Sequence, residues 1–194
     1  MQAFRTEAVA AGLHVIPAVG FDVVPTDCAA AMVAARLEQP IELHLAFQAS
    51  GGPSRGTTLT TIERLGRGSA VRRNGRVVPL RLGAIRRNIP FYDRPRRAVA
   101  IPWGDVSTAY RSTGIPDVTV YGVLPTGLSL VGRAVGGLLV VSVLRRAAEW
   151  AAKRWISGPG PDELSKGLSR VWAEAIDASG RTATVEIAGP NPYV

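Results

Sequence analysis

Polar side chains gather at the predicted start of two helices, and the first group follows an apolar run. The run, 13–19, has the composition of a buried strand, and the small-residue segment 28–37 is predicted to be a helix. Ligands of open α/β sheets bind beyond the carboxyl ends of the strands, so the turn between these elements could contact a ligand. In the plainer interpretation, Thr26 or Asp27 caps the helix and nothing binds. The candidate ligand-binding residues of this turn are Gly20, Phe21, Asp22, Pro25 and Asp27.

Five hydroxyl side chains follow Gly51-Gly52 and form the second group. Serine and threonine at the start of a helix present hydroxyls and free amides, which suit a carboxylate or a phosphate. The alternative is a cap followed by a helix, predicted over 54–65, that packs closely through small residues. A phosphate loop is excluded, because Thr57 occupies the position of the lysine that reaches the phosphates. The candidate substrate-binding residues are Ser54, Thr57 and Thr58.

The sequence lacks the usual signatures of metal and nucleophilic sites. His14 and His44 lie in separate predicted strands, and the single cysteine, Cys28, lies among alanines, where a small buried side chain is expected. There is no Gly-x-Ser-x-Gly elbow. The dinucleotide fingerprint Gly-x-Gly-x-x-Gly is absent as well, because Gly66-Arg67-Gly68 is followed by Val71 at the required position. No metal site is predicted, and no residue is assigned a catalytic role.

Positive charge is concentrated in one window of the chain. The net charge is +8, and eleven arginines lie within 64–97, where Asp93 is the one acidic residue. Such a patch could bind a phosphate, a cofactor or an acidic partner. The alternative is a compositional preference for arginine, with the guanidinium stems lying over apolar surface. Nucleic acid is not expected as a partner, since aromatic residues do not alternate with the arginines.

The remaining segments alternate between predicted strands and predicted helices. Asn74-Gly75 is a strong signal for a two-residue hairpin turn, and 168–178 and 182–188 alternate as a second hairpin. The length of 194 residues suits one domain or slightly more. Helices are also predicted over 5–11, 104–113 and 129–156, strands over 41–49, 70–71, 76–80, 98–102 and 117–123, and loops over 83–95 and 157–161.

An apolar run over 134–144 lies within the predicted helix 129–156. It is shorter than the about 20 apolar residues of a membrane-spanning helix. Packing in a core or an interface is the first interpretation. Contact with a membrane surface is the second, because basic amphipathic helices bind anionic lipid. The first residues have no signal-peptide pattern, so we expect a cytoplasmic protein, with peripheral membrane contact as the alternative.

Residues 20–27 (GFDVVPTD) resemble the Gly-Phe-Asp-Ser-x-Pro-Ser-Asp block of saccharopine dehydrogenase-like oxidoreductases, the family that includes the trans-acting enoyl reductases of lipid biosynthesis. Later stretches resemble the same family in the same order. They are 54–61, 101–116 (IPWGDVSTAYRSTGIP), 158–188 and the closing 189–193 (GPNPY). Each motif alone is moderately specific, but the similarity extends over nearly the whole chain.

The resemblance implies an NAD(P)-dependent oxidoreductase in which a Rossmann domain precedes a mixed α+β substrate or dimerisation domain. Residues 1–27 would be the last helix and strand of the Rossmann domain, and 28–194 the second domain, truncated at its C-terminus. The 20–27 turn would bind cofactor at the nicotinamide side of the cleft. Because the fingerprint is missing, we expect that NAD(P) does not bind this chain alone. A Rossmann-bearing polypeptide or a second copy of the chain is the expected partner.

Three functions are open at this point. The first is a member or fragment of such an oxidoreductase, acting on a lipid or acyl substrate as enoyl reductases do. The second is a non-catalytic interaction module that keeps the family fold, and the third is a peripheral membrane protein. The first two differ in whether NADPH binds, and the third is distinguished by binding to lipid vesicles.

Overall fold

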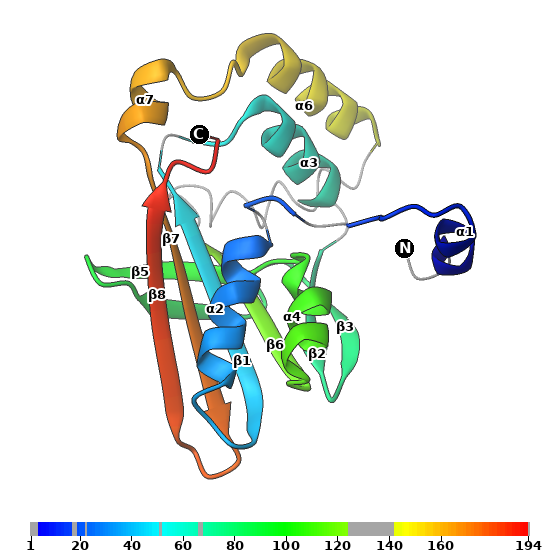
Figure 1. Cartoon of the computed structure of the whole chain (residues 1–194). Helices are drawn as coiled ribbons and strands as arrows, with labels where there is room; N and C mark the ends of the chain where they lie inside the picture. The colour runs from blue at the N-terminus through cyan, green and yellow to red at the C-terminus, as the bar shows by residue number, and fades with distance from the viewer. Residues whose placement is uncertain are drawn as a thin grey trace.

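The computed structural model describes residues 4–16, 19–21, 23–50, 52–65, 68–123 and 142–193. Within these residues, eight strands form one mixed sheet, and helices lie on one face of it and beyond one end (Figure 1). The fold class is therefore α+β, as predicted. The elements are α1 (Arg5–Ala10), α2 (Val24–Ala34), β1 (Pro40–Ala49), α3 (Arg55–Leu65), β2 (Ser69–Arg73), β3 (Arg76–Leu80), β4 (Arg86–Pro90), β5 (Pro95–Ala100), α4 (Asp105–Thr113), β6 (Asp117–Val123), α6 (Ser142–Trp155), α7 (Pro161–Lys166), β7 (Leu168–Asp177) and β8 (Thr182–Pro190).

Strand β1 lies at the centre of the sheet. It pairs in parallel with β6 on one side and antiparallel with β7 on the other, and β8 pairs with β7. The other edge of β6 is shared by two strands, because Arg72 of β2 lies opposite Val118 and β5 lies opposite 121–123. β3 pairs with β2, and β4 with β5. The sheet therefore divides into two branches beyond β6.

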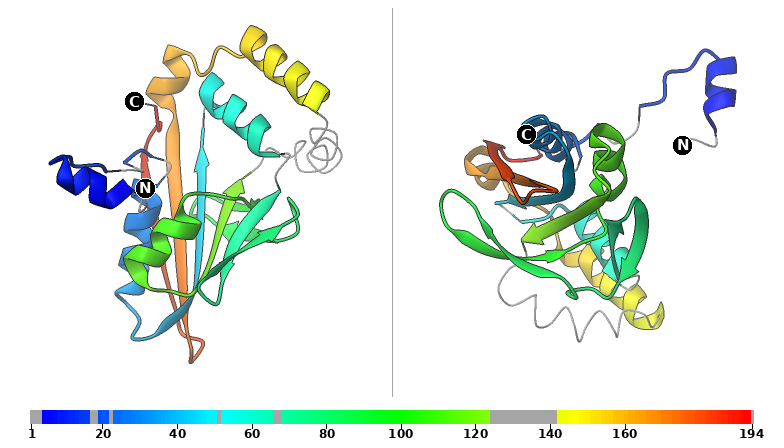
Figure 2. Two further views of the ribbon diagram at one scale, coloured as in Figure 1. Left: turned by 90° about the vertical axis from the view of Figure 1, so that its right-hand side faces the viewer. Right: turned by 90° about the horizontal axis from the view of Figure 1, so that it is seen from below.

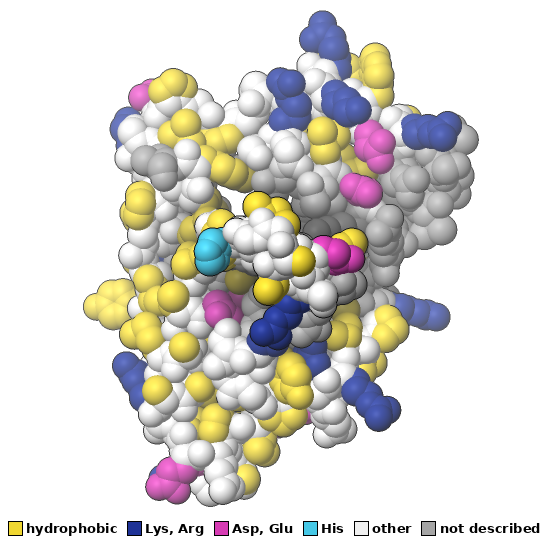
Figure 3. Space-filling model, turned by 45° about the vertical axis from the view of Figure 1, so that its right-hand side comes forward, with side chains coloured by type: hydrophobic (Ala, Val, Ile, Leu, Met, Phe, Trp, Pro, Cys, Tyr) yellow, Lys and Arg dark blue, Asp and Glu magenta, His cyan; other side chains and the backbone are white. Residues whose placement is uncertain are grey.

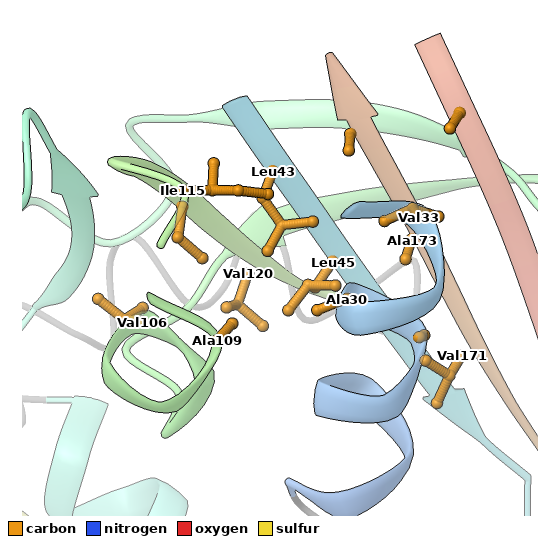
Figure 4. Packing of buried hydrophobic residues seen from close by; sticks show 14 residues of the cluster. Ala30, Val33, Leu43, Leu45, Val106, Ala109, Ile115, Val120, Val171 and Ala173 are labelled. Atoms are coloured by element: carbon orange, nitrogen blue, oxygen red, sulfur yellow. The ribbon is translucent and has the colours of Figure 1, made fainter. Parts of the chain in front are cut away.

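One face of the sheet carries an aliphatic core beneath α2 and α4. Alternate residues of a strand point to the same face, so Leu43 and Leu45 of β1 are buried together with Val120 of β6. Ala30 and Val33 of α2 are fully buried in the same cluster. Figure 4 shows these side chains converging between the strands and the two helices. Small residues on α2 allow its backbone to approach the sheet closely.

The opposite face is crossed by the β4–β5 hairpin. Phe91, just after β4, is buried against Tyr121 of β6 and Trp172 of β7. At the tip, the Tyr92 N–H donates to Glu186 Oε2 of β8 at 2.7 Å. Because β5 pairs with β6 and the tip reaches β8, the hairpin forms a second layer across the sheet. Figures 1 and 2 show it crossing the direction of the long strands.

Helices α3, α6 and α7 lie beyond the end of the sheet at which β1 and β8 terminate (Figure 1). One contact joins α3 to the end of α6, and another joins two strands at this end of the sheet. Arg55 Nε of α3 donates to the Ile156 carbonyl, just after α6, at 2.8 Å. The Ser50 N–H donates to the Leu168 carbonyl at 2.9 Å, which ties the end of β1 to the start of β7.

The predicted strand over 13–19 is wrong for the residues that the structure describes there. Residues 13–16 have no regular secondary structure, and Leu13, Val15 and Ile16 are exposed. A strand needs a neighbour for its backbone hydrogen bonds and a layer over its side chains. The described part of the chain places neither beside this segment. It leads instead to α1, which has no buried residue and projects from the body (Figures 1 and 2).

The start of α2 differs from the prediction. The helix begins at Val24 rather than at residue 28, because the fixed φ of Pro25 suits the first helical turn. Val23 is the cap residue, and no side chain caps the helix there. Neither Thr26 nor Asp27 is therefore the N-cap, and both lie inside the first turn.

Two local predictions are also wrong. Cys28 is exposed, because the buried face of α2 is formed by Ala29, Ala30 and Val33. The predicted loop over 83–95 contains strand β4, which lacks an apolar pattern and is held by its antiparallel pairing with β5.

The strands over β1 and β6 and both predicted hairpins are confirmed. The apolar run 134–144 lies mostly outside the described residues, and α6 occupies the later part of the predicted helix 129–156. No described helix is long and apolar enough to cross a membrane. The division of the chain at residue 27 stays a prediction.

Candidate functional site

The first turn of α2 meets α4 through two polar contacts, which we call the α2–α4 seam. The Thr26 hydroxyl donates to Asp105 Oδ1 at 2.5 Å, and both side chains are buried. The Ser112 hydroxyl donates to Asp27 Oδ2 at 2.6 Å. Because a buried carboxylate is costly unless hydrogen bonds reach it, these contacts fix α2 relative to α4.

The seam brings together two stretches that are far apart in the sequence, 20–27 and 101–116. It lies near the carboxyl ends of β1 and β6. Phe47, close to the end of β1, contacts Trp103 with ring centroids 4.7 Å apart. The Ile101 N–H donates to the Val120 carbonyl of β6 at 2.9 Å. This is the end of the parallel pair where ligands of α/β sheets bind.

The structure places the candidate residues of the 20–27 turn in different surroundings. The Gly20 carbonyl accepts the N–H groups of Val23 and Val24 at 3.1 and 3.0 Å, so the turn is closed by its own backbone. Phe21 packs against the aliphatic core, and Pro25 lies in the first turn of α2. Asp22 lies outside the described residues. A cofactor-binding role for this turn stays a prediction.

Asp27 is the member of this group with an acceptor atom to spare. Its Oδ2 accepts the Ser112 hydroxyl, whereas its Oδ1 is buried and has no hydrogen-bond partner within the described residues. Buried polar atoms are normally hydrogen-bonded. A ligand or water donor at this atom would complete the seam.

Ser54, Thr57 and Tyr193 form a second group, which we call the Tyr193 cluster. The Tyr193 hydroxyl accepts the Ser54 N–H at 3.1 Å and lies 2.8 Å from Thr57 Oγ1. The Thr57 N–H donates to Ser54 Oγ at 3.2 Å, so Ser54 caps α3, in agreement with the alternative of a capped helix. Two of the candidate substrate-binding residues thus lie together at the start of α3. The third, Thr58, donates its hydroxyl to the Ser54 carbonyl within the helix.

A buried asparagine fixes the tyrosine in place. Asn191 Nδ2 donates to the Ser50 carbonyl at 3.0 Å, and Asn191 Oδ1 accepts the Tyr193 N–H at 3.0 Å. Asn191 is 1% exposed. A Cβ at Gly167 would lie 2.4 Å from Asn191 Nδ2, so the backbone approach there requires glycine. The closing stretch 189–193 is therefore held against the end of β1 and the start of β7.

These hydrogen bonds change the acidity of the phenol. Partial burial by itself would raise the pKa of Tyr193, but the Ser54 N–H, the Thr57 hydroxyl and the Ser54 hydroxyl together lower that pKa below its usual value of 10.0. The side chain is 43% exposed, so the phenol is both positioned and accessible. Sequence reasoning missed Tyr193. The signal for it was the closing GPNPY stretch, which we noted only as part of a resemblance.

The arginine-rich window does not form one surface. Arg72 is buried, where its Nε donates to the Val106 carbonyl at 2.7 Å and its guanidinium lies over the Tyr110 ring. Arg87 pairs with Glu174 at 2.5 Å. Several arginines of this window thus stabilise the fold, and the exposed ones are spread over the hairpins: Arg76, Arg81, Arg86, Arg94 and Arg97.

The described residues show no grouping of His, Cys, Asp and Glu side chains that could hold a metal ion. The α2–α4 seam and the Tyr193 cluster are both linked to the carboxyl-terminal part of β1. Phe47 of β1 contacts Trp103, two residues before α4, and the Ser50 carbonyl accepts a hydrogen bond from Asn191, two residues before Tyr193.

No family model matches the sequence, and no curated protein matches it. Among solved structures, the chain is similar to apo saccharopine dehydrogenase (L-Glu forming) from Saccharomyces cerevisiae, with a TM-score of 0.55 and 10% sequence identity. The match covers 98% of this chain and 63% of that chain. The chain therefore has a fold similar to part of that protein, with a mixed sheet and flanking helices.

Proposed function

We propose that this chain is the substrate domain of an NAD(P)-dependent oxidoreductase of the saccharopine dehydrogenase-like type, and that it acts on a lipid or acyl substrate. The observation that carries the proposal is the likeness of fold, which extends over 98% of the chain. The arrangement of the sequence stretches supports it. Stretch 20–27 meets 101–116 in the α2–α4 seam, and stretch 54–61 meets 189–193 in the Tyr193 cluster.

The described residues do not fit a nicotinamide dinucleotide by themselves. The sequence lacks the Gly-x-Gly-x-x-Gly loop that brings a helix N-terminus to the pyrophosphate. At the start of α3, the Ser54 N–H already donates to Tyr193. The proposal therefore places the nucleotide on a Rossmann unit outside these 194 residues.

The N-terminal segment is suited to join such a unit. Leu13, Val15, Ile16 and Val19 are exposed although their side chains are apolar. If 13–19 pairs with the sheet of the Rossmann unit, its backbone gains hydrogen bonds and its side chains become buried. In this proposal, the segment 13–19 belongs with the nucleotide-binding unit and becomes a strand only beside its neighbours there, whereas 24–27 form the first turn of α2 in the substrate domain.

Tyr193 is the group we propose to hold a proton at the site. A phenol whose deprotonated form is stabilised by an N–H and a hydroxyl can give up its proton at the Oη atom and recover one from water. Thr57 stabilises the phenolate directly, whereas Asn191 is a positioning residue that acts through the Tyr193 backbone.

The experiment uses the protein together with its Rossmann unit, which the adjacent coding sequence is expected to supply as a Gly-x-Gly-x-x-Gly segment. Oxidation of NADPH is followed with trans-2-decenoyl-CoA as the acceptor. Tyr193→Phe is expected to lower kcat by about 100-fold or more and to remove the alkaline limb of the pH profile. Thr57→Val should lower kcat less. Thr60→Val is the matched control, because its hydroxyl bonds to the Gly56 carbonyl on the exposed side of α3.

Each part of the proposal would be contradicted by a different result. Saturable binding of NADPH to the 194-residue chain alone would contradict the division of roles between two units. Unchanged kcat and pH profile in Tyr193→Phe would contradict the role of the phenol. Failure of the completed protein to oxidise NADPH with any enoyl or carbonyl acceptor would favour the non-catalytic interaction module.

A further inference from the structure

Helix α6 presents a tryptophan surrounded by basic side chains. Trp150 is 63% exposed, and Arg146, Lys153 and Arg154 are exposed as well. These basic residues stand three or four positions from Trp150, so they lie on the same face of the helix. Trp155, 71% exposed, meets Trp150 edge to face with ring centroids 5.8 Å apart.

The other side of α6 is fixed to the body of the protein. Ala152 is buried, and α6 packs on α3. Arg55 Nε of α3 donates to the carbonyl of Ile156 at the end of α6. The tryptophan face therefore points outward from a helix that is held in place. Figure 3 shows Lys and Arg side chains projecting from this upper end of the molecule.

This combination of side chains matches the surface of an anionic bilayer. Indole rings favour the boundary between lipid and water, where the ring is buried and the N–H stays hydrated. Lys and Arg beside such rings are attracted to anionic headgroups. The one acidic residue of α6, Glu149, is partly buried and stands three positions after Arg146 and four before Lys153, so it offsets one of the three positive charges. The face is thus positively charged as well as aromatic.

We propose that α6 docks on an anionic phospholipid surface through Trp150, Trp155 and the three basic side chains. The proposal does not depend on the reaction proposed above, but it would place the start of α3 next to the membrane. The Tyr193 cluster lies at that start, so a docked protein could receive an acyl chain from the bilayer.

Exposed arginines on the two hairpins make a strict comparison possible. Tyr92 is 93% exposed at the tip of the β4–β5 hairpin, and Arg94 and Arg97 are exposed beside it. Arg76 is exposed on the other hairpin. Replacing these three arginines removes the same charge as replacing the three basic residues of α6, without changing α6.

The test is co-sedimentation of the protein with vesicles of phosphatidylcholine alone or mixed equally with phosphatidylglycerol. We expect binding to the mixed vesicles only, weakened by added salt. The triple variant Arg146→Gln, Lys153→Gln, Arg154→Gln should lower the bound fraction roughly 10-fold, and Trp150→Ala should lower it severalfold. The triple variant Arg76→Gln, Arg94→Gln, Arg97→Gln and the single variant Tyr92→Ala should bind as the unmodified protein does.

Tryptophan fluorescence supplies an independent readout. Lipids brominated near the headgroup should quench the emission of the docked protein, and the double variant Trp150→Ala, Trp155→Ala should remove most of that quenching, since Trp172 is buried. The proposal is overturned if the protein does not bind mixed vesicles. It is also overturned if the hairpin triple variant loses as much binding as the α6 triple variant, or if quenching persists when both Trp150 and Trp155 are replaced by alanine.

Discussion

The two faces of the central sheet differ in the kind of side chains that they bury. The face beneath α2 and α4 is aliphatic, with Leu43 and Leu45 of β1 fully buried. The face beneath the β4–β5 hairpin combines aromatic and charged groups. On that face His44 lies beside Tyr121, with ring centroids 6.0 Å apart, and Arg87 lies over Trp172. Strand β1 therefore contributes to one core whose stability does not depend on pH and to another whose stability does.

His44 links the stability of the hairpin face to pH. Burial and the nearby Arg87 and Arg73 guanidiniums lower the pKa of His44 from 6.5 to about 4. Glu42 Oε2 lies 3.4 Å from His44 Nε2, but its side chain is 47% exposed, so it offsets these effects little. A neutral imidazole is thus kept between two cations, where a protonated one would be repelled.

The largest expected effect tests the aliphatic face. Leu45→Ala removes a fully buried side chain and leaves a cavity, which should lower the free energy of unfolding by about 2–5 kcal/mol. The loss should be the same at neutral and at acidic pH, as measured by urea denaturation. Ile41→Ala, in the exposed part of the same strand, is the control and should cost far less. If the loss of unfolding free energy caused by Leu45→Ala depended strongly on pH, the distinction between the two faces would be wrong.

The second prediction concerns the pH dependence of the hairpin face. The folded protein binds the proton of His44 more weakly than the unfolded chain, so the free energy of unfolding should fall as the pH drops from 6.5 to about 4. The contribution of this group is about 3 kcal/mol over that window and is constant above it. Denaturation across the window should show this slope in the unmodified protein.

The matched variant is His44→Gln, which keeps a polar side chain without a titrating group. Its stability should lack the part of the slope between pH 4 and 6.5 that His44 contributes. Equal slopes in the two proteins would show that this face does not exclude the protonated imidazole.

The smallest effect is expected from Arg87→Met, which keeps the length of the side chain and removes its charge. The pKa of His44 should rise toward 6.5, because one of the two nearby cations is gone. Glu174 loses its partner, and because the pair is partly exposed, the free energy of unfolding should fall by about 1 kcal/mol. NMR titration of the imidazole measures the first effect. Arg86→Met, the exposed neighbour, should leave the His44 titration unchanged.

The contrast also explains which elements the sequence predicted. The alternation of 41–49 reflects one aliphatic face, and it correctly predicted β1. Strand β4 has no such pattern, because Ile89 is its one fully buried side chain and its other residues are held mainly by pairing with β5. The segment 13–19 has a strand composition but no neighbour among the described residues. Local pattern thus predicted strands with an aliphatic face, and failed where pairing alone decides.

The candidate site shows the same limit. The start of α3 was predicted from its serine and threonines, and Ser54 does cap the helix. Its partner Tyr193 lies 136 positions beyond Thr57, and no local pattern connects them. The Thr26–Asp105 contact likewise depends on how α2 and α4 pack on the sheet. The α2–α4 seam and the Tyr193 cluster each combine two stretches that are distant in the sequence. The sequence could therefore indicate the separate stretches, but only the tertiary fold brings them together.

The position of β1 between β6 and β7 has a consequence for how the molecule assembles. Leu43 faces Val118 on one side and Ala175 on the other, partners about 75 and about 130 residues further along the chain. Closing loops of that length is slow, and during synthesis the middle strand emerges long before either neighbour. We expect refolding on the scale of milliseconds to seconds, and a newly made chain that needs protection from aggregation until its last hairpin has left the ribosome.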